Sequence, residues 1–306
     1  MDAIPFVTLD EARYGVSVQV SPLVRRVIAH NPSKYTYHGT GTYIIGHGDV
    51  AVIDPGPLLD DHRHALDAAL DGDRVRAILV THCHSDHSPL ASWLREDSGA
   101  PTIAFGPHGS VEGETDETVL DDGLTLEEST DLEFDPDVRL GDGEIAAMGA
   151  GWTLRGVHTP GHTSNHMCYS LDEEHALFTG DHVMGWSTTV VSPPDGDMRA
   201  YMDSLRKVMA RADASLWPTH GAPVTSPKPF LDAFLQHRLQ REAQILSAVR
   251  AGQSEIEAMV KVLYADVREE LHKPAARSVL SHLMKLIADG AVTVEGGGKD
   301  ARYFAT

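Results

Sequence analysis

Cysteine is almost absent from the 306-residue sequence, which contains only Cys83 and Cys168. Two cysteines provide no disulfide framework, so we expect a protein of a reducing, cytoplasmic compartment. Long apolar runs are also missing, because no stretch approaches the roughly 20 residues that a membrane-spanning helix requires. Residues 1–10 contain no basic segment followed by an apolar run, so we expect no secretion signal and no membrane partner.

Basic residues are scarce, with 25 Lys and Arg against 45 Asp and Glu and a formal net charge of −20. The deficit lies in one part of the chain: residues 199–306 hold 15 bases and 12 acids, and residues 1–198 hold 10 bases and 33 acids. Residues 111–144 alone hold 14 acids and one base. Because phosphates are recruited by Lys and Arg, this composition disfavours nucleic acid as a partner. The change in charge along the chain is a candidate domain boundary.

The hydrophobic pattern also changes along the chain. Short β-rich runs interleaved with helical patterns over 1–228 predict a layered α/β or α+β domain. Amphipathic helices are then predicted over 229–250, over 256–263 and from Pro274 onwards, followed by a β-hairpin at 291–304. Three helices and a hairpin are the layout of a winged helix. We therefore predict two domains, residues 1–228 and residues 229–306.

The strongest chemical signal is the sequence Thr-His-Cys-His-Ser-Asp-His at 81–87, which directly follows a predicted strand at 75–80. Three imidazoles and a carboxylate this close together suit Zn²⁺ or a similar divalent ion. One loop cannot surround a metal ion, so other ligands must come from elsewhere. Three later strand ends offer a His or an Asp beside Gly or Pro, at His162, Asp181 and His220.

This pattern resembles the metallo-β-lactamase fold superfamily, whose HxHxDH motif is matched by His82, His84, Asp86 and His87. The resemblance implies an α+β, four-layer αββα fold and two divalent metal ions, Zn in the first place, with Mn or Fe also possible. It implies that one ion is held by His82, His84 and His162, and the second by Asp86, His87 and His220, with Asp181 bridging both. Asp54 matches a position that supports the ligand loop. The ligand set is similar to the glyoxalase II and ribonuclease-like branches, not to the antibiotic-hydrolysing lactamases that use a cysteine.

The predicted winged helix after such a domain resembles the two-domain lactamase-beta-like group, which includes an endoribonuclease and fungal thioesterases acting on carrier-bound polyketides. The resemblance implies a hydroxide shared by two metals that attacks a small-molecule carbonyl substrate: a thioester, ester, lactone or amide. Asp86 is then a metal ligand and the catalytic residue that orients the nucleophile. A metal-dependent endoribonuclease is the alternative, which the acidity of residues 1–198 disfavours. A third interpretation is a winged-helix protein that senses a ligand without catalysis. The sequence leaves the oligomeric state open.

Other residues have weaker signals. Alternation along the motif predicts that Cys83 is packed and not catalytic. Ordinary core or surface roles are expected for four other histidines, His38, His108, His166 and His182. Arg277, Ser281 and Lys285 share one helix face, which we expect to be solvated, although a nucleic-acid recognition helix is the alternative. The acidic segment 111–144, which the two-domain group lacks, is either a lid or a solvated loop. Trp186, Ser187 and Thr188 either line the pocket or simply pack.

Overall fold

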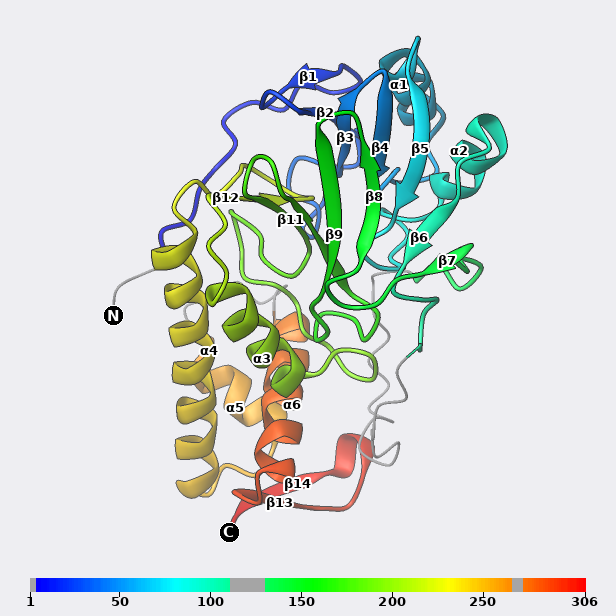
Figure 1. Ribbon diagram of the computed structural model, residues 1–306. Coiled ribbons are helices and arrows are strands. Elements are labelled where there is room, and N and C mark those ends of the chain that lie inside the picture. Colours follow the sequence, from blue (N-terminus) through cyan, green and yellow to red (C-terminus); the bar gives the residue numbers. More distant parts are fainter. Residues whose placement is uncertain (1–3, 111–129, 266–271) are drawn as a thin grey trace.

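A computed structural model describes residues 4–110, 130–265 and 272–306. Its centre is a pair of β-sheets (Figure 1). The first has the order β1-β2-β3-β4-β5-β6-β7, with antiparallel pairing from β1 to β4 and parallel pairing from β4 to β7. Its strands are β1 Val18–Gln19, β2 Val24–Ile28, β3 Gly41–His47, β4 Asp49–Ile53, β5 Arg74–Leu79, β6 Thr102–Ala104 and β7 Val138–Arg139.

The second sheet has the order β12-β11-β10-β9-β8, in which only β11 and β12 are parallel. Its strands are β8 Ile145–Gly149, β9 Trp152–His158, β10 Met167–Leu171, β11 Ala176–Gly180 and β12 Ser215–Pro218. The two sheets pack face to face around a shared apolar cluster. Tyr43, Ile53 and Leu79 of the first sheet belong to this cluster together with Tyr169 and Phe178 of the second.

Helices cover the outer face of each sheet, as the strand sequences require. Alternate residues of β4 point to opposite faces, so that Ile53 joins the cluster between the sheets while Val52 joins an outer cluster with α1 Asp60–Leu70 and α2 Leu90–Ser98. On the other side, Leu177 of β11 packs with α3 Met198–Met209 and α4 Pro227–Arg250. The arrangement confirms the predicted four-layer αββα fold.

The C-terminal part forms the predicted winged helix. It contains α5 Ile256–Leu263, α6 His272–Ala288, β13 Val292–Glu295, the short 3₁₀ turn Gly298–Asp300 and β14 Arg302–Ala305. The long helix α4 contributes to two cores: Phe230 and Phe234 pack with the second sheet, whereas Ile245 and Val249 pack with α5 and α6. The proposed division at residue 228 therefore stays a prediction: it falls in the first turn of α4, and that helix belongs to both parts (Figure 1).

The expectation that Arg277, Ser281 and Lys285 form a solvated face is wrong. Arg277 is 8% exposed and Ser281 is 2% exposed. The Lys285 ammonium forms ion pairs with Glu242 of α4 at 3.0 Å and with Asp289 at 2.8 Å. The reason is that α6 contacts α3 and α4 as well as α5, so more of its surface is covered than the apolar stripe alone.

None of the helices in the described part of the chain combines the length and the apolar composition that spanning a bilayer requires.

Whether the acidic segment 111–144 is a lid or a solvated loop depends largely on residues 111–129, which lie outside the described residues. In the remainder, the Asp131 carboxylate accepts a hydrogen bond from Ser88 and the Asp137 carboxylate accepts one from Thr102.

Candidate metal centre

Four strand ends bring the seven predicted ligands together. The loop after β5 provides His82, His84, Asp86 and His87; the loop after β9 provides His162; β11 ends just before Asp181 and β12 ends just before His220. The potential ligand atoms of three overlapping sets each lie within 4.8 Å of one another. The sets are His82, His84 and His162; His82, His87 and Asp181; and Asp86, His87 and His220.

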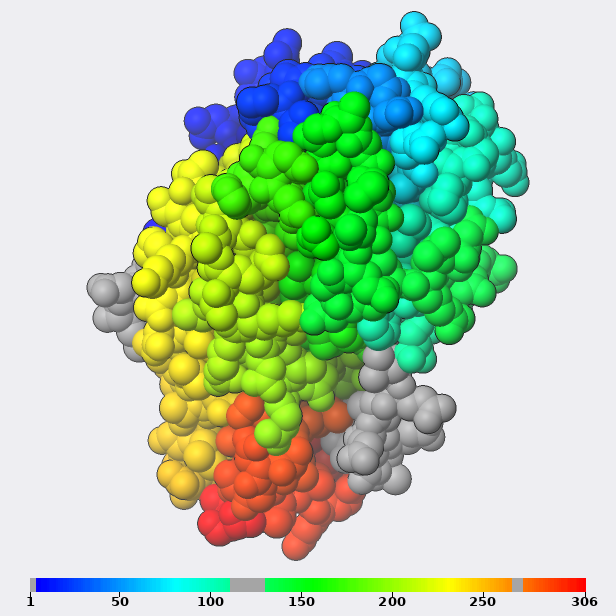
Figure 2. Space-filling model, viewed as in Figure 1, coloured from blue at the N-terminus to red at the C-terminus, as the bar shows by residue number. Residues whose placement is uncertain are grey.

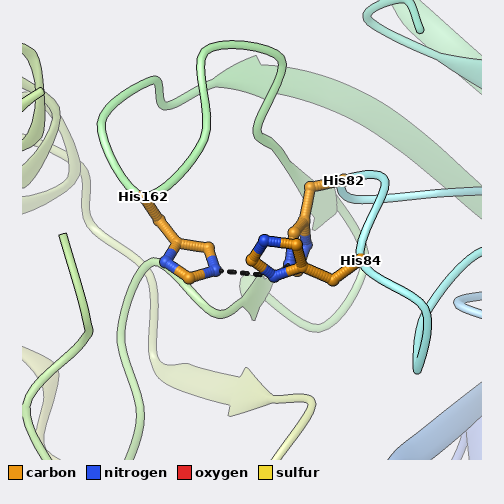
Figure 3. Close-up of side chains that lie close together, drawn as sticks. All are labelled: His82, His84 and His162. Atoms are coloured by element: carbon orange, nitrogen blue, oxygen red, sulfur yellow. Dashed lines mark hydrogen bonds between the residues drawn. The ribbon is translucent and has the colours of Figure 1, made fainter. Parts of the chain in front are cut away.

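The three-histidine group consists of His82, His84 and His162. Its ring nitrogens converge, with His82 Nε2 at 2.9 Å and His162 Nε2 at 3.2 Å from the same atom, His84 Nδ1 (Figure 3). Burial lowers the pKa of His82 and of His84 well below the ordinary value, and neighbouring histidines lower them further. Three ring nitrogens that converge in this way can all coordinate one cation, so the group is a ready donor set for a metal ion.

The carboxylate group consists of Asp86, His87 and His220, with Asp181 beside them. Asp86 Oδ2 lies 3.2 Å from His220 Nε2 and 3.5 Å from His87 Nε2, and Asp181 Oδ1 lies 3.4 Å from His220 Nε2. Burial alone would lower the pKa of His87, but the carboxylates of Asp86, Asp181 and Asp54 raise it to about 10. The pKa of His220 is also raised, because Asp181 and Asp86 outweigh its burial. The carboxylate group, together with Asp181, therefore stabilises positive charge.

Two buried atoms in and beside the carboxylate group indicate that the positive charge favoured there is that of a metal ion. Within the described residues, His87 Nε2 and Asp181 Oδ1 are buried and have no hydrogen-bond partner. Leaving such atoms unpaired costs about 1–3 kcal/mol each, more where the group is charged. A divalent cation coordinated by both would remove that cost. The residues present therefore fit the metal ions that the sequence motif suggests.

Asp54 supports the ligand loop as the sequence indicates. It follows β4 in a left-handed conformation with φ 49°. Its Oδ2 accepts hydrogen bonds from His87 Nδ1 at 2.9 Å, from the Thr81 hydroxyl at 2.8 Å and from the Thr219 hydroxyl at 3.1 Å. One buried carboxylate thus joins the ends of β4, β5 and β12. Because Asp54 holds Nδ1 of His87, it is Nε2 that faces the candidate metal centre and would coordinate an ion.

Backbone carbonyls orient two other ligands. His162 Nδ1 donates to the Val190 carbonyl at 2.6 Å, and His220 Nδ1 donates to the Gly39 carbonyl at 3.1 Å. These bonds leave Nε2 of each ring free to coordinate, which is the usual arrangement around metal-binding histidines.

Sequence reasoning missed Thr40, which holds Asp86. The Thr40 hydroxyl donates to Asp86 Oδ2 at 2.9 Å and accepts from Asn31 Nδ2 at 2.9 Å, while the Thr40 amide donates to Asn31 Oδ1 at 2.9 Å. The Asp86 side chain, which is 21% exposed, is therefore fixed although it lies at the open side of the centre. Thr40 belongs to an irregular segment between β2 and β3, where no periodic pattern marks it.

The remaining histidines and Cys83 take structural or lining positions. His166 Nε2 accepts the Asp181 amide at 3.2 Å, so His166 lies behind that ligand. His182 is fully buried against Tyr201, and burial lowers its pKa to about 3. Cys83 is packed as expected, and burial raises the pKa of its thiol to about 12, which argues against a nucleophile.

His38 and Trp186 lie at the side of the centre that contains Gly39. His38 Nε2 donates to the Leu9 carbonyl at 2.9 Å. The Trp186 ring stacks on Tyr37 with 4.8 Å between ring centroids, and a Cβ on Gly221 would lie 3.0 Å from Trp186 Cδ1. Trp186 therefore packs close to the backbone that follows His220.

A cavity of about 180 Å³ opens beside the three-histidine group. Its walls include His84 and His162. They also include His108 and Asp195, and His108 Nδ1 lies 3.5 Å from Asp195 Oδ2. Among the described residues that line it there is no Lys or Arg. The cavity therefore reaches two residues of the three-histidine group, His84 and His162.

Comparisons with known proteins agree with this geometry. A family model of the metallo-beta-lactamase superfamily matches residues 37–220, and a model of the beta-lactamase associated winged helix domain matches residues 256–300. The chain is 31% identical to an Aspergillus chevalieri protein named atrochrysone carboxyl ACP thioesterase, over 94% of this chain and 88% of that protein. It is also 31% identical to the Caenorhabditis elegans beta-lactamase-like protein 2 homolog, over 90% of this chain and 87% of that protein.

A solved structure has the same fold over nearly the whole chain. It is a beta-lactamase domain protein from Burkholderia ambifaria, with a TM-score of 0.79 and 23% sequence identity. The match covers 97% of this chain and 96% of that chain, so it includes the winged helix as well as the two sheets.

Proposed function

This chain belongs to the metallo-beta-lactamase superfamily and is a hydrolase, and from that premise we propose that it cleaves thioesters with the help of two divalent metal ions. The observation that carries the proposal is the convergence of seven potential ligand side chains, two of which, His87 and Asp181, have buried atoms without a hydrogen-bond partner. The choice of a thioester rests on the relatives named acyl carrier protein thioesterases, which match almost the full length of the chain.

The proposed ligands divide between two ions. The three-histidine group would hold one ion, and Asp86, His87 and His220 would hold the other, with Asp181 available as a ligand to both. We expect Zn²⁺, while Mn²⁺ or Fe²⁺ also suit imidazole and carboxylate ligands. When bound, such ions make water acidic enough to provide a nucleophile near neutral pH and polarise a carbonyl group.

Asp86 is the proposed catalytic residue. Its Oδ2 is fixed by Thr40, so it can hold an attacking water in one orientation, accept its proton and later release that proton. In the overall reaction, the water oxygen bonds to the carbonyl carbon and the carbon–sulfur bond breaks. The thiolate that leaves takes up the proton, and a carboxylic acid and a thiol are the products.

Charge supports a small carbonyl substrate over RNA. Residues 1–198, which contain all the proposed ligands except His220, hold 33 acids and 10 bases. An RNA strand needs a basic track that leads to the metal ions. The cavity at His84 and His162 has no Lys or Arg among the described residues that line it.

The test is a substrate panel on the metal-loaded protein. Thioesters and oxygen esters of benzoic acid, together with a lactone, would be compared with single-stranded RNA at equal enzyme concentration. We expect the thioesters to be hydrolysed fastest and the activity to disappear with a chelator. Metal-dependent cleavage of RNA without turnover of any thioester would overturn the proposal.

A further inference from the structure

The helix α4 carries a charged side chain into the interior, close to the metal centre. Arg238 is only 3% exposed. Its Nη2 donates a hydrogen bond to the Thr189 carbonyl, and its guanidinium lies over the Tyr201 ring, 5.0 Å from the ring centroid. Among the described residues, its Nε has no hydrogen-bond partner. Because a charged group is rarely buried this completely, packing alone does not account for an arginine at this position.

Thr189 connects Arg238 to Asp181, the proposed ligand that both halves of the centre can use. The Thr189 hydroxyl donates to the Asp181 carbonyl at 2.8 Å and, at 2.9 Å, to the carbonyl of His182. The Tyr201 hydroxyl donates to the same His182 carbonyl at 3.0 Å. Thr189 and Tyr201, the two residues that Arg238 contacts, therefore hold the backbone of residues 181 and 182.

The next residue along the chain, Val190, holds a second proposed ligand. Its carbonyl accepts the hydrogen bond from His162 Nδ1 at 2.6 Å, which leaves His162 Nε2 directed at His84 (Figure 3). Residues 189 and 190 thus contact one ligand of the three-histidine group as well as the backbone of Asp181. Because the two residues are adjacent, a shift of the carbonyl that Arg238 binds would also shift the carbonyl that orients His162.

The same helix connects this position to the winged helix. In Figure 2 the yellow surface of α4 runs along one side of the molecule, from the green surface of the second sheet to the orange-red surface of the C-terminal part. One turn after Arg238, Arg241 makes contacts of the same two kinds with the winged helix. Its Nη1 donates to the Leu263 carbonyl at 3.0 Å, and its guanidinium lies 4.1 Å from the centroid of the Tyr264 ring. The two arginines are therefore a matched pair, of which only Arg238 contacts the metal-centre loop.

We propose that Arg238 is a positioning residue of the metal centre. By holding residues 189 and 190, it fixes Asp181 and His162 in the places from which they would coordinate the ions. The winged helix then supports the proposed reaction from a distance, because it packs on Ile245 and Val249 of α4 and so keeps the helix that carries Arg238 in place. The inference rests on the proposed two-ion function and adds a residue outside the ligand set on which metal binding depends.

The first test compares Arg238→Met with Arg241→Met in the metal-free protein. Methionine removes the charge and the donors and keeps an unbranched apolar stem. The His182 amide is the reporter, because it donates to the Thr179 carbonyl at 2.9 Å. We expect its hydrogen–deuterium exchange, followed by mass spectrometry, to become about tenfold faster or more in Arg238→Met, whereas Arg241→Met should speed exchange over 256–263 instead. Equal exchange of the His182 amide in the wild type and in Arg238→Met would contradict the proposal.

The second test measures Zn²⁺ affinity by competition with a chelator. We expect Arg238→Met to bind Zn²⁺ about ten- to a hundredfold more weakly, the loss typical of removing a group that orients metal ligands. Arg241→Met makes the same chemical change one turn away and should bind Zn²⁺ as the wild type does. Arg238→Lys keeps a cation that can donate to the Thr189 carbonyl, so it should recover most of the affinity. An equal loss in Arg241→Met, or no recovery with lysine, would indicate general destabilisation and overturn the positioning role.

Two outcomes separate this inference from the proposed function. If the wild-type protein binds no Zn²⁺, the two-ion function fails; faster exchange at His182 in Arg238→Met then still supports the hold on residues 189 and 190, and unchanged exchange overturns it. If the wild type binds two equivalents and Arg238→Met binds them with unchanged affinity, Arg238 is not a positioning residue and the two-ion function stands.

Discussion

The three-histidine group and the carboxylate group place the same imidazole ring in opposite electrostatic surroundings. His82 is buried among other histidines, and its pKa lies well below the ordinary value. His87 is equally buried, yet the carboxylates of Asp86, Asp181 and Asp54 raise its pKa to about 10. Burial alone therefore does not decide the protonation of these rings. The neighbouring carboxylates decide it, and they also make the two halves unequal as metal sites.

Asp181 joins the two halves, and its removal has the largest expected effect. Its Oδ2 lies 3.8 Å from His162 Nε2 and its Oδ1 lies 3.4 Å from His220 Nε2. We predict that Asp181→Ala loses most of the bound metal and lowers kcat at least about a thousandfold, because both ions lose a ligand. Elemental analysis and thioester hydrolysis measure the two effects.

The matched variant is Asp86→Asn, which changes the carboxylate group alone. We expect it to lose one equivalent of metal and keep the ion of the three-histidine group. If Asp181→Ala retained two equivalents, the two halves would be independent sites and the bridging role would be wrong.

The pH dependence of the metal-free protein sharpens the comparison. His82, His84 and His182 have lowered pKa values when folded, so their contribution to stability is present above the ordinary histidine pKa of about 6.5 and is lost as the pH falls below it. His87 and His220 have raised pKa values, so their contribution is present below about 6.5 and is lost as the pH rises, for His87 through about 10.

We therefore predict that the free energy of unfolding of the metal-free protein is largest near pH 6.5, measured by urea denaturation between pH 5 and pH 10. Asp86→Asn should weaken the alkaline loss and leave the acidic loss in place, because only the carboxylate group changes. A metal-free protein whose stability is constant from pH 6.5 to pH 10 would show that the carboxylates do not hold His87 and His220 in their protonated form.

Thr40 tests the carboxylate group on its own and has the smallest expected effect. Thr40→Val keeps the shape of the side chain but removes the hydrogen bond to Asp86 Oδ2. A hydrogen bond to a charged group contributes about 1.5–3 kcal/mol, so kcat should fall about ten- to a hundredfold while metal content stays at the wild-type value. Thr40→Ser should restore kcat. A change in KM alone, or no rescue by serine, would contradict a positioning role.

The clustering of the seven proposed ligands was largely predictable, because four of them lie in one short motif and the other three match later strand ends in the pattern of the family that the sequence resembles. Strands that alternate between two buried faces indicate two layers, and the ligands follow strand ends, as in the 81–87 motif. Thr40 was not predictable, because it reaches Asp86 from an irregular segment 46 residues earlier. Ser281 was assigned to a solvated face because helical periodicity reports one buried stripe. It cannot show that a second face is covered by another part of the chain.

Both halves of the candidate centre, the three-histidine group and the carboxylate group, are proposed to hold a metal ion at once. The most direct measurement is a stepwise addition of Zn²⁺ to the metal-free protein, with bound metal determined by elemental analysis and activity measured on a thioester of benzoic acid at each step. We predict that bound metal reaches two equivalents per chain and that activity is maximal only at the second. Saturation of metal content and activity at a single equivalent would contradict it.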